Sequence, residues 1–198
     1  MSVAVVLGAG FGATVSLVND LSSPYGELGG RLVAAGWRPV TNVAEVGSLV
    51  LDVGWAWAAV AVAAGWLAGG SIARGAAAGA VALLGATTAY YVMDAVLRDE
   101  PASGYLAEAR YWWLASLMLG PFLGAVGAML LRSGVIGLLA MLIVPVGALV
   151  QTLLLQPGLM SSSRPAALWA LLIVSAAAIA AISVGVARFV TQRSQRPA

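Results

Sequence analysis

Apolar residues fill six long runs along the chain, and polar residues gather in the shorter stretches between them. Each run is about 20 residues long, the length that an α-helix needs to cross the roughly 30 Å hydrocarbon core of a bilayer. No block alternates apolar and polar residues with period two, as the strands of an outer-membrane barrel do. The pattern predicts an all-α fold, a single domain over residues 1–198 built as a bundle of six transmembrane helices at 2–21, 46–70, 75–97, 111–131, 134–155 and 166–190.

The carboxylates all fall on one side of this predicted bundle, beside nearly all of the Trp and Tyr residues. Asp20, Asp52 and Asp94 lie at or just inside the ends of apolar runs, where a carboxyl group is costly and usually faces a bundle interior or a watery cavity. We therefore expect the functional site on this face. The eight acids are Asp20, Glu27, Glu45, Asp52, Asp94, Asp99, Glu100 and Glu108.

The Arg residues predict the orientation in the membrane. With six spans both termini share a side, and the C-terminal tail carries a cluster of Arg without an acid (Arg188, Arg193 and Arg196). By the positive-inside rule this cluster favours the cytoplasm for both termini, which makes the acidic face extracytoplasmic. On that face, residues 22–45 are expected to hold a short interfacial helix between Glu27 and Trp37, and residues 98–110 a polar loop.

Composition removes several kinds of chemistry. The chain is 61% hydrophobic, its mean hydropathy is +0.95, and it contains no Cys, His or Lys. Thiol nucleophiles, disulfides, the usual zinc sites and Lys Schiff bases are therefore excluded, and we expect neither a metal nor a cofactor. The scattered Arg residues form no basic stripe, which argues against nucleic acid as a partner. Abundant Gly and Ala, as in Gly8-x-Gly10-x-Gly12, predict helices that pack backbone to backbone.

Polar and aromatic residues recur at helical spacing near the acidic face. On the second span Asp52 is expected to share a helix face with Trp55, and on the third span Asp94 with Tyr90. If the bundle closes, these faces line one aromatic cavity. The candidate catalytic acids are Asp52, Asp94 and Asp20, and the candidate substrate-binding residues are Trp55, Tyr90, Tyr91, Trp112, Trp113 and Gln151.

Anchoring in the bilayer interface is an alternative reading of several of these residues, since Trp and Tyr are enriched there. Asp94 could pair with Arg98 one turn later and be a helix cap, and Asp52 could pair with an Arg of the loops. Anchoring alone does not explain why the opposite side has only Trp66 and Phe189, or why polar residues recur on defined helix faces.

Short motifs give two resemblances. A long first connection is followed by three short motifs, Asp52-Val53-Gly54-Trp55, Thr88-Ala89-Tyr90-Tyr91 and Gly120-Pro121-Phe122-Leu123-Gly124-Ala125. Together these features resemble an uncharacterised family of small actinobacterial integral membrane proteins over the first five spans. That resemblance implies a multi-pass protein of a bacterial plasma membrane and carries no activity. In size and in its face of acids and aromatics, the chain is also similar to the small bacterial transmembrane terpene cyclases, from which no residue is carried over.

Two functions fit these features. The first is a metal-independent cyclase of a prenyl chain, in which a neutral carboxylic acid in an apolar pocket protonates an alkene or epoxide and aromatic faces stabilise the carbocations. The second is a carrier, or a substrate-binding subunit similar to those of energy-coupling-factor transporters, with Gly75, Gly79 and Ala82–Ala86 as the face for a partner. A third alternative is a non-catalytic assembly or regulatory membrane protein, and a homo-oligomer remains open for each of them. The expected partners are the bilayer and a hydrophobic prenylated small molecule.

Overall fold

The computed structural model describes residues 1–69, 71–155 and 164–194, and the secondary structure of these residues is helical. The prediction of an all-α polytopic bundle is confirmed. Five helical segments are long and apolar enough to cross a membrane, and a bent pair of helices supplies a sixth span if the pair is counted as one.

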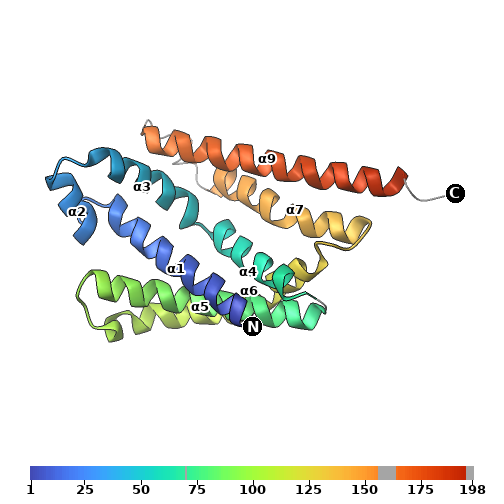
Figure 1. Cartoon of the computed structure of the whole chain (residues 1–198), viewed down its shortest axis with the longest axis horizontal. Helices are drawn as coiled ribbons and strands as arrows, with labels where there is room; N and C mark the ends of the chain where they lie inside the picture. The colour runs from blue at the N-terminus through green and yellow to red at the C-terminus, as the bar shows by residue number, and fades with distance from the viewer. Residues whose placement is uncertain (70, 156–163, 195–198) are drawn as a thin grey trace.

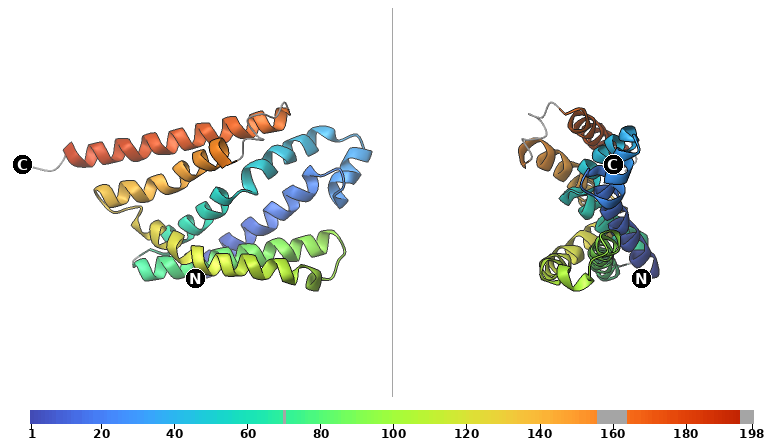
Figure 2. Two further views of the ribbon diagram at one scale, coloured as in Figure 1. Left: turned by 180° about the vertical axis from the view of Figure 1, so that it is seen from behind. Right: turned by 90° about the vertical axis from the view of Figure 1, so that its left-hand side faces the viewer.

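The helices form three layers (Figures 1 and 2). The middle layer holds α1 (Ser2–Ser22), α3 (Arg38–Leu51) and α4 (Gly54–Ala68). On one side of it lie α5 (Ile72–Leu97) and α6 (Leu106–Met129), and on the other side lie α7 (Val135–Val150) and α9 (Pro165–Ser194). A short π-helix, η2 (Gln151–Leu155), extends α7. This arrangement leaves the space between α4, α5 and α6 for a site.

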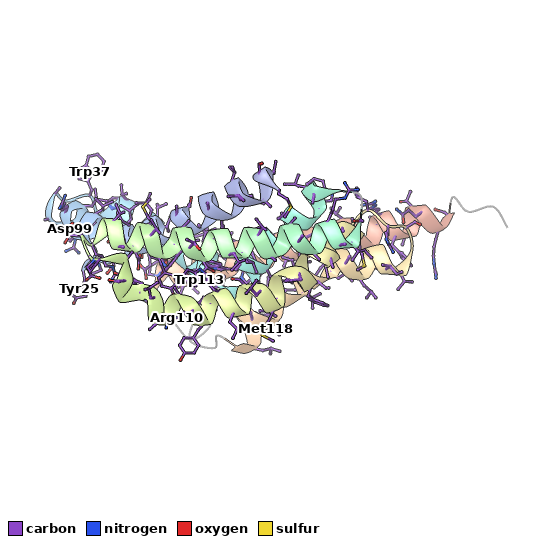
Figure 3. The ribbon with its side chains drawn as sticks, turned by 90° about the horizontal axis from the view of Figure 1, so that it is seen from below. Tyr25, Trp37, Asp99, Arg110, Trp113 and Met118 are labelled. Atoms are coloured by element: carbon purple, nitrogen blue, oxygen red, sulfur yellow. The ribbon has the colours of Figure 1, made fainter. Side chains whose placement is uncertain are left out.

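The polar end of the molecule is capped by short elements. The expected helix after the first span is α2 (Glu27–Ala34), and the connection from α5 to α6 contains the 3₁₀ turn η1 (Ala102–Tyr105). Tyr25, Trp37 and Asp99 gather at this end in Figure 3. The first residues of α1 and the last described residues of α9 lie away from this end (Figure 1).

The second span differs from the prediction. A single helix over 46–70 is wrong, because α3 begins already at Arg38 and the chain breaks after Leu51, with α3 and α4 bent by 67°. Val53 is extended (φ −138°, ψ 148°) between them. Such a break is tolerated at membrane depth where neighbouring groups satisfy the freed backbone. Here the Gln151 side chain does so, since its Oε1 accepts a hydrogen bond from the backbone N–H of Trp55 at 3.1 Å.

Small residues bring the helices into backbone contact. A Cβ atom added at Gly8 or Gly12 of α1 would collide with the backbone of Ala82 or Ala86 of α5, while one added at Gly10 would meet no atom within 4 Å. The close packing predicted for Gly8-x-Gly10-x-Gly12 is therefore confirmed at Gly8 and Gly12 and wrong at Gly10, which is exposed. It is the kind of contact by which small residues associate membrane helices.

The small-residue face of α5 is covered inside the molecule. Gly75 and Gly79 pack against Gly120 and Gly124 of α6, just as the alanines of the same face pack on α1. The hypothesis that this face is presented to a transporter partner is therefore wrong, because α1 and α6 already occupy it.

Candidate functional site

A cavity of about 410 Å³ lies between the start of α4, the middle of α5 and the first half of α6. Its polar mouth belongs to the acidic end of the molecule, and its floor is apolar. The lining residues are Asp52, Val53, Gly54, Trp57, Ala58, Leu83, Thr87, Tyr90, Tyr91, Glu108, Trp112, Ala115, Ser116, Leu119 and Leu123. The sequence-predicted residues among them are Asp52, Tyr90, Tyr91 and Trp112.

Asp52 reaches the cavity because it stands at the break between α3 and α4. Its Oδ2 accepts a hydrogen bond of 2.7 Å from Nδ2 of Asn19 on α1. The same amide nitrogen lies 3.2 Å from the hydroxyl of Tyr90, and the amide oxygen accepts a hydrogen bond of 2.7 Å from Ser48. Asn19 thus ties α1, α3 and α5 together and fixes the orientation of the Asp52 carboxylate.

Glu108, in the first turn of α6, is a second carboxylate at the mouth that the sequence reasoning missed. It lies beside the hydroxyl of Tyr91. The spacing of Glu108, Trp112 and Ser116 is that of one helix face. The sequence shows this spacing, but the predicted span of residues 111–131 places Glu108 in the loop before it.

Four aromatic rings from three helices form the wall. Trp57 of α4 contacts Tyr90 with ring centroids 6.0 Å apart, and Tyr90 contacts Tyr91 at 5.3 Å, both edge to face. Trp112 of α6 supplies the fourth ring. All four rings line the cavity, and the face of an aromatic ring attracts cations.

The inner part of the cavity is small and apolar, with one polar pair. Thr87 and Ser116 share a hydrogen bond of 3.2 Å, and Ser116 also donates to the carbonyl of Trp112 at 2.7 Å, so both hydroxyls are satisfied within the helices. On α6, Trp112 lies one turn before Ser116 and Leu119 about one turn after it. Both residues line the cavity, yet each is 56% exposed. The cavity is therefore open along α6 towards the surface that a bilayer would cover.

Asp94 is close to the site but turned away from the cavity. It is only 8% exposed, accepts a hydrogen bond of 2.7 Å from Ser16 of α1, and pairs with Arg98 at 3.6 Å. The alternative reading of Asp94 as the partner of Arg98 is confirmed. The expectation that Asp94 lines one cavity together with Asp52 is wrong, because Asp94 binds Ser16 of α1 and Arg98 and is not among the lining residues.

Asp20 has a structural contact instead of a place in the cavity. Its two carboxylate oxygens accept hydrogen bonds from the backbone N–H groups of Glu27 and Leu28 at 3.0 and 2.9 Å. These are free donors at the start of α2, where a negative charge is favourable. Asp20 therefore caps α2 and holds it against the end of α1.

Three of the predicted wall residues lie outside the cavity lining. The break after Leu51 changes the phase of the second span, so Trp57 lines the cavity in place of Trp55. Trp113 points between α5 and α6 (Figure 3) and donates from Nε1 to Thr88 at 3.1 Å. Gln151 supports the start of α4 through the contact with Trp55 described above.

Comparisons with known proteins leave the site to be interpreted from its own chemistry. No protein-family model, no curated protein and no solved structure matches the chain. Within the described ranges, no three carboxylates come together as a set of metal ligands. The resemblance to an actinobacterial membrane family stays a prediction.

Proposed function

We propose that the protein is a membrane-embedded cyclase that binds a hydrophobic prenylated molecule in the α4–α5–α6 cavity. The observation that carries this proposal is the combination of a carboxylate at the mouth, four aromatic rings in the wall and an apolar floor in one cavity of about 410 Å³. That volume lies within the roughly 300–1,000 Å³ range of small-molecule sites. The opening along α6 gives a prenyl chain a route from the bilayer.

Asp52 is the proposed acid. Its protonated carboxyl gives a proton to a terminal alkene or epoxide of the substrate, the C=C π bond or the C–O bond breaks, and a carbocation forms. A second alkene of the same chain attacks this cation and closes a ring. The hydrogen bond from Asn19 stabilises the Asp52 carboxylate that remains after the transfer.

The wall and the second carboxylate complete the proposed cycle. Ring faces of Trp57, Tyr90 and Trp112 stabilise the migrating positive charge. Glu108 accepts the proton that leaves the last cation, so the overall reaction is an isomerisation without a net gain or loss of protons. Water at the mouth then returns Asp52 to its protonated form and Glu108 to its ionised form.

Asp52→Asn tests this proposal. The variant protein in nanodiscs is incubated with a panel of linear prenylated substrates in D₂O, and products are analysed by chromatography and mass spectrometry. Since Asn cannot deliver the initiating proton, we expect turnover to fall by at least about 100-fold, the range of general acid catalysis. The unaltered protein should place one non-exchangeable deuterium in each product molecule formed from an alkene.

Asp99→Asn is the matched control, because it makes the same chemical change in an exposed residue of the α5–α6 connection, where Asn also tolerates the positive φ of 53°. It should keep full activity. Turnover that survives in Asp52→Asn, or unchanged substrates throughout the panel with the unaltered protein, would contradict the cyclase proposal.

A carrier for a small solute is the second candidate, and the break between α3 and α4 favours it. Discontinuous helices at the depth of the site are common in secondary transporters, where half-helix ends meet the substrate. The same assay separates the two functions. A carrier binds a solute and releases it unmodified, and no deuterium enters it.

The location proposed for this activity is a bacterial plasma membrane, with both termini in the cytoplasm and the mouth of the cavity on the outer side. The Arg residues near the C-terminus support this orientation by the positive-inside rule.

A further inference from the structure

We infer that the cavity is selective for molecules that carry a positive charge on an apolar body, such as a tertiary or quaternary ammonium ion with an aliphatic tail. The inference rests on the proposed function, because it names the class of ligand that the same cavity binds. It does not require that the protein convert a substrate to a product.

The charges around the cavity have one sign. Asp52 and Glu108 line the mouth from different elements, and no Arg is among the lining residues. In the described part of the chain, the ion pairs are Arg31–Glu27, Arg98–Asp94 and Arg164–Glu45, so neither lining carboxylate has a cationic partner there. Two acidic side chains without a cationic partner beside a partly apolar cavity favour a ligand that brings a positive charge.

The wall is suited to a cation that is weakly hydrated. Trp57, Tyr90, Tyr91 and Trp112 surround the space next to the two carboxylates. Aromatic groups combined in this way are the usual means of recognising quaternary ammonium groups, which have no N–H to donate and are attracted by ring faces. A small metal ion or a strongly hydrated cation gains less from such a wall.

The floor fits the rest of the molecule. Leu83, Leu119 and Leu123 lie deeper than the carboxylates, and the polar atoms there, Thr87 and Ser116, already bond to each other. An aliphatic tail therefore meets apolar surface without leaving a polar group unsatisfied. The opening beside Trp112 and Leu119 lets the tail enter from lipid.

A matched pair of ligands gives the test. Radiolabelled decyltrimethylammonium is bound to the protein in nanodiscs, with empty nanodiscs as the control for partition into lipid. The competitor is the neutral isostere in which a quaternary carbon replaces the nitrogen. We expect the cation to bind at least about tenfold more tightly than the isostere, because only the cation gains from the rings and the carboxylates.

Variants locate the effect. Asp52→Asn combined with Glu108→Gln should reduce the preference for the cation to the part that the rings provide and leave binding of the isostere unchanged, while Asp99→Asn should change neither. Equal binding of cation and isostere by the unaltered protein would overturn the inference without any variant. A preference of undiminished size in the double variant would also overturn it.

The outcome is distinguishable from that of the proposed function. Preferential cation binding without any prenyl turnover would support this inference and contradict the cyclase. Turnover of prenyl substrates together with equal binding of the two probes would support the cyclase and contradict the inference.

Discussion

Gly12→Ala should destabilise the protein far more than the same change at Gly10, two residues earlier in α1. The added Cβ at position 12 would lie well inside the 3.0 Å that real Cβ atoms keep, against the carbonyl oxygen of Ala86 in α5. Because the atom in the way belongs to the backbone, it cannot move aside by a change of rotamer as the end of a long side chain can. Helix α1 has to move away from α5 by about an ångström, which by itself forfeits a quarter to a half of the dispersion attraction across the contact.

The expected magnitude follows from the packing around that contact. Val15 and Ser16, about one turn after Gly12 in α1, are fully buried, so a shift of α1 opens gaps in the packing beside the crossing. Overpacking of this kind typically costs about 1–3 kcal/mol, and we expect a loss of about 2–3 kcal/mol for Gly12→Ala. At position 10 the new methyl group meets nothing within 4 Å, so its effect should stay below about 1 kcal/mol.

The measurement is reversible unfolding in mixed micelles by titration with sodium dodecyl sulfate, followed by circular dichroism. The shift of α1 should also disturb the site, because Ser16 and Asn19 lie one and two turns after Gly12 and hold Asp94 and Asp52 by hydrogen bonds of 2.7 Å. Free energies of unfolding that differ by less than about 0.5 kcal/mol between the two variants would refute the close crossing of α1 and α5, since independent surface changes usually stay within that range.

The helical type of the elements and the approximate positions of the long apolar helices could be predicted because bilayer thickness imposes a length on each apolar run. The helix after the first span could also be predicted, since Glu27, Leu28 and Leu32 give it a polar start and an apolar side. Its structure as α2, Glu27–Ala34, follows that pattern. The backbone contacts at Gly8 and Gly12 were predictable for a similar reason, as two glycines four residues apart lie on one helix face.

The break in the second span could not be predicted from local sequence. Residues 46–70 contain no Pro, and a polar residue at position 52 does not by itself end a membrane helix. The break is stabilised by distant groups: Asn19 binds Asp52 across 33 positions, and Gln151 binds the N–H of Trp55 across 96. Such tertiary contacts have no signal in the periodicity of one span.

The errors in the site follow from the errors in the boundaries. A span that is interrupted at Val53 restarts with a different phase, which turns Trp57 rather than Trp55 to the cavity. A span that begins at Leu106 rather than Tyr111 brings Glu108 onto the helix face of Trp112. Tyr90 and Tyr91 were placed well because α5 is one unbroken helix from Ile72 to Leu97.

Two further predictions concern the cap of α2 and the orientation of the molecule. Asp20→Asn should lower the free energy of unfolding by about 1–2 kcal/mol in the same titration, because the amide can accept from only one of the two N–H groups that the carboxylate now binds. Asp99→Asn is the control and should have no comparable effect. Equal losses of stability in the two variants would contradict the capping role of Asp20. For the orientation, single Cys residues at Glu27, Glu100 and Arg193 in this Cys-free chain are treated with a membrane-impermeant maleimide on intact bacterial cells. Because five spans separate Glu27 from Arg193 and three separate Glu100 from Arg193, both odd numbers, the two acidic positions lie on the opposite side from Arg193; they should react on intact cells, and Arg193 only after permeabilisation. The reverse pattern would place the termini outside, and reaction of all three from one side would contradict the six-span topology itself.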